Sequence, residues 1–325
     1  MTMQRVIVAR PGAQTCVQDL GRHGWRHIGV GRAGALDPAQ AALANRLVGN
    51  APDAAVLEIA MTGPTLECIQ PSCVALCGAE IDARFEDGDG YKQSVPLGRA
   101  VTLPAGTLRL GAVRNGVRAW LAIAGGIDVP LVLGSRSTDL RGGFGGIEGR
   151  ALRAGDTLAL GAHAVIDTAQ LQAPTWWVSL DDAASRRAPI RYVPSSLAAA
   201  PALADREWRV NPRSDRQGLR CTGEPLTMDL PEQISAPVAP GTIQLPPDGR
   251  PIVLLADAQT VGGYPRLGHV IAADMPRLAQ LRAGDALRFE AVTQADAQAA
   301  RRRRRNEIAR LHWAIDRAFA QRTRA

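Results

Sequence analysis

The chain has 325 residues, 46% of them hydrophobic and 21% charged, which is the composition of a globular protein large enough for two domains. Its formal charge of +7 is unevenly distributed, because the segment from Thr293 onward carries nine arginines against three acidic residues. The rest of the chain is close to neutral, which argues against a nucleic-acid-binding surface and predicts no nucleic-acid partner.

The first predicted elements are a short strand at Val6–Ala9 and a glycine-rich loop over Gln18–Asp37. A helix is predicted from Asp37 to Val48, because Asp37 is a good N-cap, a proline follows at the first helical position, and Gly49 is a stop signal. Six further strands are predicted from short apolar runs bounded by turn residues. They span Val56–Met61, Thr65–Ile69, Cys73–Cys77, Arg99–Leu103, Thr107–Val113 and Val117–Ala124.

Asn115 and Gly116 separate the last two of these strands. Asn-Gly is a preferred sequence for a two-residue hairpin turn, so these strands are expected to fold back on each other. From Gln294 the chain is predicted to be helical, with Arg301–Arg305 on a solvated face. This tail is expected to be dispensable for folding.

A short repeat suggests the domain organisation. The sequence LRAGDTL at Leu152–Leu158 is echoed by LRAGDAL at Leu281–Leu287, and a strand with a glycine-rich continuation precedes each copy. Two echoes in the same order predict two related β-modules, arranged as a barrel or sandwich pair. We expect the first module over residues 1–165, the second over 166–292 including a crossing segment, and an arginine-rich helical tail over 293–325.

Lysine and cysteine usage narrows the chemistry. Lys92 is the only lysine, and its context fits neither a phosphate-binding P-loop nor a biotin-carrying lysine, so nucleotide or biotin chemistry would need another chain. Among the five cysteines, Cys68, Cys73 and Cys77 lie in a mostly apolar stretch and are expected to be buried free thiols, and neither they nor His23 and His27 have the spacing of a metal site. Because no apolar run suits a signal peptide or a membrane span, we expect a cytoplasmic protein with no membrane partner.

Several longer phrases, in order from about residue 10 to about residue 290, carry a resemblance. They are VQDLGRHGWRHIGV, GALDPAQAALANRLVGN, LEIAMTGP, AGGIDVPLVLGSRSTDLRGGFGG, SDRQGLRCTGEPL and GTIQLPPDGRPIVLLADAQTVGGYPRLGHV. Together they resemble the allophanate hydrolase subunit 2 family of biotin-dependent carboxyltransferases, which includes the C subunit of bacterial 5-oxoprolinase and the carboxyltransferase region of urea carboxylase. The resemblance implies a mostly β fold of two related cyclophilin-like β-barrel modules, with a few short helices and a C-terminal helix.

The resemblance also implies a function. It suggests one component of a multi-subunit, ATP-dependent 5-oxoprolinase, which opens the lactam of 5-oxo-L-proline to glutamate, with ATP bound in the complex. The implied partners are a companion that resembles allophanate hydrolase subunit 1 or the B subunit of 5-oxoprolinase, and a lactam-utilisation A subunit. Two alternatives stay open: a carboxyltransferase that acts on urea or a related small amide with biotin on a partner chain, and a non-catalytic regulatory partner of the companion protein.

The candidate site centres on ADAQTVGGYPRLGH at Ala256–His269, where polar residues follow the apolar run Ile252–Leu255. The two adjacent glycines could simply form a turn, but the polar residues and the resemblance favour the wall of a ligand cleft. The candidate catalytic residues are Arg136, Gln259 and Tyr264. The candidate substrate-binding residues are Gln18, Asp19, Arg22, Asn45, Ser137, Thr138, Asp139, Arg216, Gln244, Thr260, Gly262 and Gly263.

Structural interpretations compete with several of these assignments. Asp19 and Arg22 could form an ion pair of small energetic value, and Ser137–Asp139 could cap a turn rather than form a second polar rim of the same cleft. Arg216 could complete a structural carboxylate pair rather than capture an anionic substrate or a phosphate of ATP.

Overall fold

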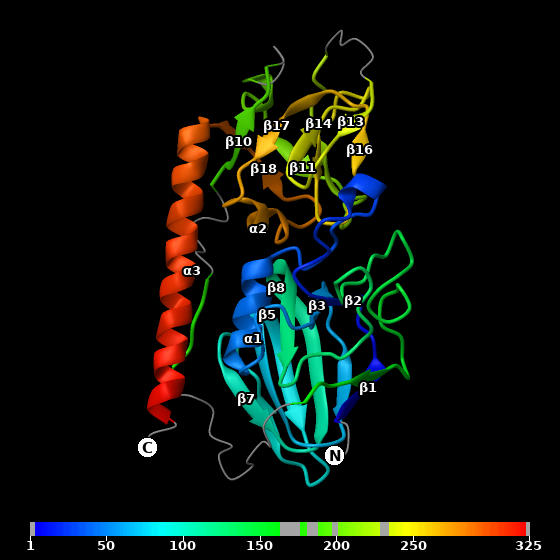
Figure 1. The fold of residues 1–325 in the computed structure, drawn as a ribbon, viewed down its shortest axis with the longest axis vertical. Coiled ribbons are helices and arrows are strands. Elements are labelled where there is room, and N and C mark those ends of the chain that lie inside the picture. The colour runs from blue at the N-terminus through cyan, green and yellow to red at the C-terminus, as the bar shows by residue number, and fades with distance from the viewer. Residues whose placement is uncertain (1–3, 163–175, 181–187, 197–200, 228–233, 323–325) are drawn as a thin grey trace. The chain divides into compact units, whose positions relative to one another are not determined.

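The computed structural model describes residues 4–162, 176–180, 188–196, 201–227 and 234–322 (Figure 1). Contacts divide the chain into two compact units. Unit 1 comprises Met1–Arg22, Asp37–Asp181 and Ile308–Ala325. Unit 2 comprises His23–Leu36 and Asp182–Glu307.

This division differs from the linear one expected from the sequence. The expected boundary between the two modules, at residues 165 and 166, lies outside the described residues. The loop His23–Leu36 belongs to unit 2 although it lies early in the chain, and the expected tail is shared between the units instead of standing apart.

Unit 1 contains a nine-stranded antiparallel sheet with the main order β2-β3-β8-β4-β1-β9, to which β5 adds by pairing with β6, β7 and β8. Its strands are β1 (Arg5–Arg10), β2 (Gln14–Gln18), β3 (Val56–Ala60), β4 (Thr65–Cys68), β5 (Ser72–Glu86), β6 (Lys92–Ser94), β7 (Ala100–Leu103), β8 (Gly106–Ile123) and β9 (Thr157–Ala159).

The hairpin predicted at Asn115 and Gly116 is wrong. Residues on both sides of this pair belong to one strand, β8, which pairs with β5 along most of its length. The positive φ of Asn115, 49°, accompanies a break in register rather than a reversal of the chain, and the Asn115 side chain donates to Glu80 at 2.9 Å. Pairing with a long neighbouring strand outweighs the local preference of Asn-Gly for a turn.

Helix α1 (Pro38–Leu47) confirms the predicted helix. The Asp37 carboxylate accepts from the backbone N–H groups of Ala39 and Gln40, at 3.0 and 3.2 Å, which satisfies donors that a helix start leaves open. The helix packs against β5 and β8.

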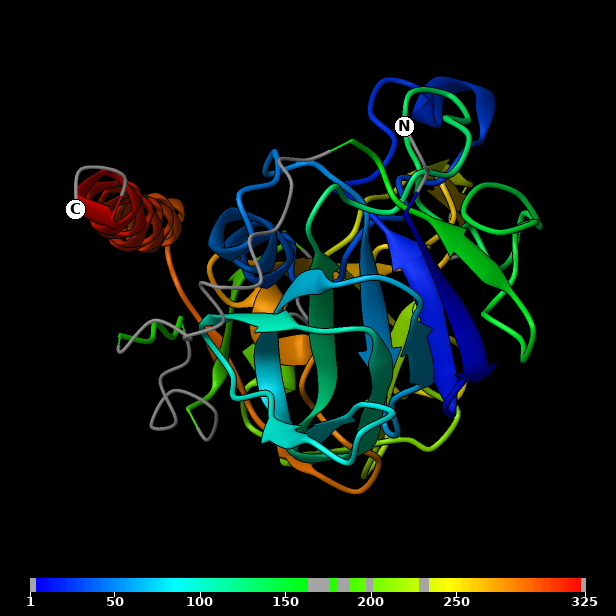
Figure 2. The same ribbon diagram turned by 90° about the horizontal axis from the view of Figure 1, so that it is seen from below.

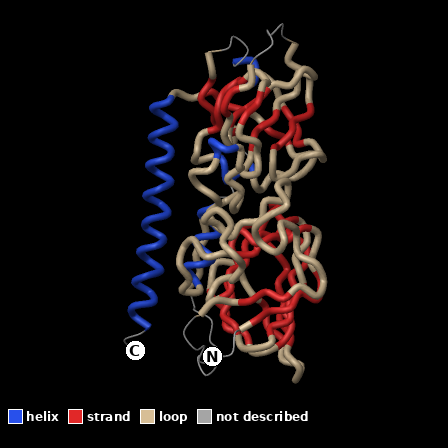
Figure 3. Tube along the Cα trace, turned by 45° about the vertical axis from the view of Figure 1, so that its right-hand side comes forward, coloured by secondary structure: helices blue, strands red, loops and turns tan. Residues whose placement is uncertain are grey.

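The interior of unit 1 is a continuous apolar cluster. In Figures 2 and 3 its strands curve around a central space, which gives the sheet a barrel-like form. Side chains fill that space, and the fully buried members include Leu57, Leu76, Leu108 and Leu121. Burial of this apolar surface is the main stabilising term for such a fold.

Unit 2 contains an eight-stranded sheet in the order β18-β11-β12-β15-β14-β17-β10-β19, and β13 and β16 pair separately. Its elements are η1 (Arg26–Ile28), β10 (Ile190–Pro194), η4 (Pro201–Leu203), β11 (Trp208–Val210), β12 (Gly218–Thr222), β13 (Ala236–Pro237), β14 (Thr242–Gln244), β15 (Ile252–Leu254), β16 (Val261–Gly262), β17 (Arg266–Val270), α2 (Met275–Leu278), β18 (Ala286–Leu287) and β19 (Phe289–Ala291). Tyr192 and Phe289 pack edge to face inside this unit, with ring centroids 6.0 Å apart.

The repeated LRAGD sequence forms the same turn in both units. In unit 1 Gly155 donates to the carbonyl of Val8 at 2.8 Å, and in unit 2 Gly284 donates to the carbonyl of Val210 at 2.8 Å. Both glycines have a φ of 89°, a conformation that other residues rarely adopt. Each turn leads into a strand antiparallel to the one it contacts, β9 beside β1 and β18 beside β11. The repeat therefore marks corresponding parts of two β-modules, as expected.

Helix α3 (Gln294–Arg322) confirms the predicted C-terminal helix, and four of the arginines in Arg301–Arg305 are exposed, as expected of a solvated face. Its last part nevertheless packs within unit 1. Ile315 is only 1% exposed, Asp316 forms an ion pair with Arg46 of α1, and Phe319 packs edge to face against Trp176. These contacts argue against a tail that folding could dispense with.

We therefore expect Ile315→Ala to destabilise the protein by about 2 kcal/mol, because it removes a fully buried side chain and leaves a cavity. In a unit of this size the unfolding midpoint should fall by roughly 4–8 °C in a thermal melt. Arg310→Ala, at an exposed position of the same helix, is the matched control and should change the midpoint little. Equal unfolding midpoints for the two variants would indicate that folding does not depend on the tail.

Candidate functional site

Arg216 and Asp257 form a buried ion pair in unit 2. The Arg216 Nε and Nη2 atoms each donate to the Asp257 carboxylate at 2.9 Å, and the two side chains are 4% and 2% exposed. Arg216 Nη2 also donates to the carbonyl of Gly34 at 2.6 Å, which holds the loop His23–Leu36 against the end of β15. These contacts fit the interpretation of Arg216 as part of a structural pair with a carboxylate. Capture of an anionic substrate by Arg216 stays a prediction.

Gln244, at the end of β14, lies beside Gln259 and Gly262. Its side chain is 1% exposed, and its Oε1 accepts from Gln259 Nε2 at 3.4 Å. That contact orients the amide, so that the donor group Nε2 faces elsewhere. Nε2 is buried and has no acceptor among the described residues. An unused buried donor costs free energy unless another group accepts from it, which makes Gln244 Nε2 a candidate donor to a ligand oxygen.

Gly262 leaves room for this amide. A Cβ atom built at Gly262 would lie 2.6 Å from Gln244 Nε2, closer than real Cβ atoms come to their neighbours. Gly262 belongs to β16, whose pairing with β13 places Gly262 opposite Ala236. A side chain at position 262 would therefore push the Gln244 amide out of its present position.

The other residues of the Ala256–His269 sequence differ in how far they are exposed. Thr260 is buried, and its carbonyl accepts from the backbone N–H of Val238 at 3.0 Å. Gly263 is half-buried, whereas the Tyr264 side chain is 46% exposed. The sequence thus forms a short β-ladder that positions Gln259 and Gly262 and leaves Tyr264 accessible.

Two arginines that the sequence analysis did not select, Arg26 and Arg32, also belong to unit 2. Arg26 donates through Nη2 to the carbonyls of Val238 and Gln259, the latter at 3.4 Å. Burial lowers the pKa of Arg32, and the positive charge of Arg26 lowers it further. A signal for them existed in the sequence, because the stretch between Asp19 and Asp37 carries arginines and histidines but no acidic residue.

In unit 1, Asp19 is the centre of a hydrogen-bonded loop. Its Oδ1 accepts from the Ser135 hydroxyl at 2.6 Å and from the Ser137 hydroxyl at 2.5 Å, and its Oδ2 accepts from the Arg136 backbone N–H at 2.5 Å. Gln18 donates to the Thr138 carbonyl at 3.1 Å, and the Thr138 hydroxyl donates to a backbone carbonyl of β2. These hydrogen bonds connect the end of β2 with residues 135–138 of the same unit, so the predicted residues have a structural role here.

The other predicted residues of unit 1 are also engaged inside it. Arg22 is 1% exposed, donates to the Ser137 carbonyl, and lies over the Phe144 ring at 4.6 Å, so it is not the surface partner of Asp19 that the sequence suggested. Asp139 accepts from the backbone N–H groups of residues 141 and 142, which makes it a turn cap.

Asn45 and Arg136 complete the set in unit 1. Asn45 donates to the Ala54 carbonyl at 2.7 Å and closes the turn after α1. The Arg136 side chain is half-exposed and contacts Asp128 at 3.2 Å. The structure thus groups the predicted residues within unit 1 and within unit 2 separately, and a cleft common to both groups stays a prediction.

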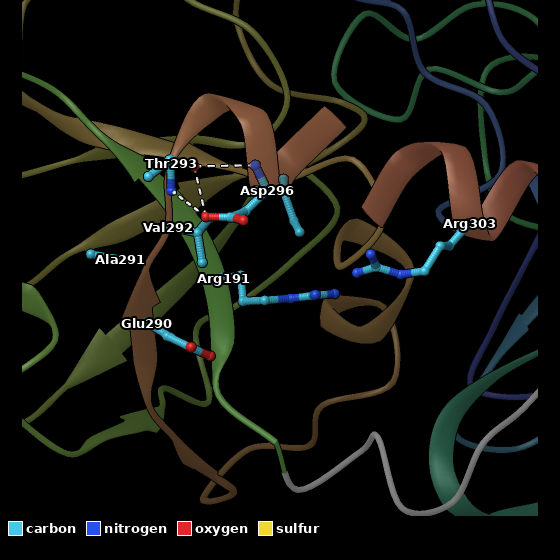
Figure 4. A pocket seen from close by; sticks show the side chains of 8 residues that line it. Arg191, Glu290, Ala291, Val292, Thr293, Asp296 and Arg303 are labelled. Atoms are coloured by element: carbon cyan, nitrogen blue, oxygen red, sulfur yellow. Dashed lines mark hydrogen bonds between the residues drawn. The ribbon is translucent and has the colours of Figure 1, made fainter. Parts of the chain in front are cut away.

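A cavity of about 560 Å³ lies elsewhere in unit 2, and none of the predicted site residues lines it (Figure 4). Arg191 and Arg303 extend toward it, and Thr293 and Asp296 are hydrogen-bonded at the start of α3. The Arg191 guanidinium is already bound by the Asp274 carboxylate, at 2.6 and 3.0 Å. Its charge is therefore balanced by that of Asp274.

All five cysteines are free thiols, and four of them are buried. In the described parts of the chain no three metal-binding side chains gather, and no helix is both long and apolar enough to cross a bilayer. Burial raises the pKa of Cys68 and Cys73 to about 11 and that of Cys221 to about 12. These thiols are poor nucleophiles at neutral pH, since the thiolate is the reactive form.

We therefore expect the native protein to react only slowly with a thiol reagent at pH 8, and all five thiols to react at once in denaturant. Absorbance after addition of a disulfide reagent measures both. Fast reaction of one thiol or more in the native protein would show that a cysteine is accessible and activated.

The comparisons with known proteins agree with the fold. Residues 28–291 match the family described as "Carboxyltransferase domain, subdomain A and B". The C subunit of 5-oxoprolinase from Escherichia coli (strain K12) is 38% identical over 95% of this chain and 98% of its own length. The Haemophilus influenzae protein of the same name is 36% identical over 91% of this chain and 93% of its own length.

A solved structure shows the same architecture. The urea carboxylase of Kluyveromyces lactis superposes with a TM-score of 0.81 and 27% identity over 95% of this chain. This chain spans only 29% of that much longer protein. Because the family match covers most of the chain and the bacterial relatives match along nearly their whole length, the chain belongs to the family of carboxyltransferase domains with subdomains A and B.

Proposed function

We propose that this chain is the C-type component of a multi-subunit, ATP-dependent 5-oxoprolinase, which opens the lactam ring of 5-oxo-L-proline to give glutamate. The observation that carries this proposal is the 38% and 36% identity to two proteins named as C subunits of 5-oxoprolinase, which extends along almost the whole of each relative. A B-type companion and a lactam-utilisation A subunit would complete the enzyme.

The Gln244 site supplies chemistry that suits a lactam. A lactam presents a carbonyl oxygen, and the buried Gln244 Nε2 is a donor with no acceptor of its own in the described chain. Gln259 donates to the other end of this amide, at Oε1, which leaves Nε2 as the end that would meet a ligand oxygen. A fixed donor of this kind stabilises the negative charge that develops on a carbonyl oxygen during attack. In the complex, ATP would supply the phosphoryl group that activates the carbonyl.

The experiment that tests the proposal is reconstitution. The chain co-expressed with its companion proteins should form glutamate from 5-oxo-L-proline only when ATP is present. The isolated chain should be folded and inactive, because it has no P-loop and a single lysine outside any known nucleotide motif. Robust turnover by the isolated chain, or none by the assembled complex, would overturn the proposal.

Carboxyl transfer is a second candidate, favoured by the family description and by the likeness to urea carboxylase. In this case biotin on a partner chain would deliver a carboxyl group to urea or a related small amide. Incorporation of labelled bicarbonate into the amide, dependent on a biotinylated partner, would favour this activity over lactam opening.

Two substitutions test the Ala256–His269 sequence directly. We expect Gln259→Ala and Tyr264→Phe each to lower the kcat/KM of the assembled complex tenfold or more, which corresponds to about 1.4 kcal/mol of transition-state stabilisation. Folding should change little, because Gln259 is half-buried and Tyr264 is 46% exposed. Wild-type kinetics in both variants would reduce this sequence to a structural turn.

A further inference from the structure

Arg26 and Arg32 form an arginine pair in the glycine-rich loop of unit 2. Arg26 lies on η1, which ends at Gly29 in the left-handed conformation. Arg32 precedes Ala33, whose N–H donates to the Ala256 carbonyl at 3.1 Å. The pair therefore lies beside the start of the Ala256–His269 sequence, within the same unit.

Neither arginine has a carboxylate partner in the described chain. Arg26 Nη2 is occupied by the carbonyls of Val238 and Gln259, but Arg26 Nη1 is buried without an acceptor. Arg32 Nε is likewise buried without an acceptor. Together with Gln244 Nε2, this part of unit 2 contains three buried hydrogen-bond donors, and no described residue accepts from any of them.

The positive charges of Arg26 and Arg32 are unfavourable in these positions. Burial lowers the pKa of both arginines, and the charge of Arg26 lowers that of Arg32 further, so the two like charges are close enough to repel each other. An arginine keeps its charge even so, and a bound anion would relieve the repulsion within the pair.

Two other arginines of unit 2, buried Arg216 and half-buried Arg191, each have a carboxylate partner. Arg216 makes a two-point contact with Asp257, and Arg191 makes one with Asp274. The arginine pair departs from this pattern at the place where Gln244 also lacks an acceptor. Planar guanidinium groups suit two-point binding of a carboxylate, which supplies the acceptor oxygens that the site lacks.

We propose that the arginine pair is a carboxylate-binding subsite, and that it acts with Gln244 to hold a small cyclic carboxylate. Gln244 Nε2 donates to the carbonyl oxygen of the ring, while Arg26 and Arg32 bind the carboxylate. The identity of the ring as a lactam rests on the proposed function, whereas binding of the carboxylate rests on the arginine pair alone.

The test measures binding to the full chain by calorimetry, with two matched pairs of probes. The first pair is 5-oxo-L-proline and its carboxamide, and the second is cyclopentanecarboxylate and its carboxamide, which lacks the lactam. The wild-type protein should bind each carboxylate at least tenfold more tightly than the matching amide. In Arg32→Gln and in Arg26→Gln, the ratio of the amide's Kd to the carboxylate's Kd should fall to about one.

Arg303→Gln is the control, because it removes an exposed arginine of the same unit, at the cavity of Figure 4. This variant should keep the full preference for the carboxylate over the amide. Circular dichroism checks folding, and Arg32→Gln is the cleaner variant because Arg26 also holds two backbone carbonyls. An undiminished preference in Arg32→Gln, an equal loss in Arg303→Gln, or no wild-type preference would overturn the proposal. A preference that depends on Arg32, in a complex that does not process 5-oxo-L-proline, would uphold the subsite and refute only the proposed function.

Discussion

Replacing Asp257 by alanine should lower the free energy of unfolding by about 3–5 kcal/mol, the range expected when one partner of a buried ion pair is removed. The Arg216 guanidinium is 4% exposed and would lose the carboxylate that binds both its Nε and its Nη2. The loss comes mainly from a charge left buried without its counter-ion, rather than from the attraction that the pair itself provided. Urea denaturation followed by circular dichroism measures the change.

The control for this prediction is Asp248→Ala. Asp248 contacts Arg250 at 3.8 Å, but both side chains are largely exposed, at 58% and 42%. Pairs of this kind contribute about 0–1 kcal/mol, so the control should unfold almost like the wild type. If Asp257→Ala cost no more than Asp248→Ala, Arg216 would have to be bound by other groups, and its role as an anchor of the loop His23–Leu36 would be lost.

Replacing Gln244 by methionine should lower the kcat of the assembled complex by roughly 10²–10³, the range for loss of one donor to a developing oxyanion. Methionine has a similar length and no donor. Folding should be close to normal, because the change removes a buried donor that has no acceptor in the described structure, and because Gln259, which loses its 3.4 Å contact, is only half-buried. Steady-state kinetics of the complex, together with a thermal melt, separate the two effects.

Two variants sharpen this test. Gly262→Ala should reproduce part of the loss, because its Cβ would lie 2.6 Å from Gln244 Nε2 and displace the amide. Gln93→Met in β6 of unit 1 makes the same chemical change at a surface strand and should leave activity unchanged. Full activity in Gln244→Met would show that the amide serves packing alone.

Local sequence signals predicted the elements that depend on neighbouring residues. Helix α1 starts at its predicted cap, because Asp37 satisfies the backbone donors of the next residues without help from elsewhere. The repeated LRAGD turn was also recognisable, since its glycine needs a conformation that few other residues adopt. The Asn115-Gly116 hairpin failed for the opposite reason, because its outcome depended on pairing with β5, which no local pattern records.

The candidate site was only partly predictable. Gln244, Gln259 and Gly262 were selected and do lie together, because polar residues at strand ends near glycines are a recognisable pattern. Arg26 and Arg32 were missed, because an arginine in a loop is usually solvated and only its surroundings show whether a carboxylate reaches it.

By itself the sequence determined the mostly β character, the two related modules, the caps and turns, and the resemblance to a carboxyltransferase family. The tertiary structure decided which polar groups are occupied and which are left for a ligand. Arg216 meets Asp257 across 41 residues, while Arg26 reaches the Gln259 carbonyl from a loop 233 residues earlier. Such pairings depend on strand register and on the packing of distant segments, and the free energy of a buried charge depends on which partner that packing supplies.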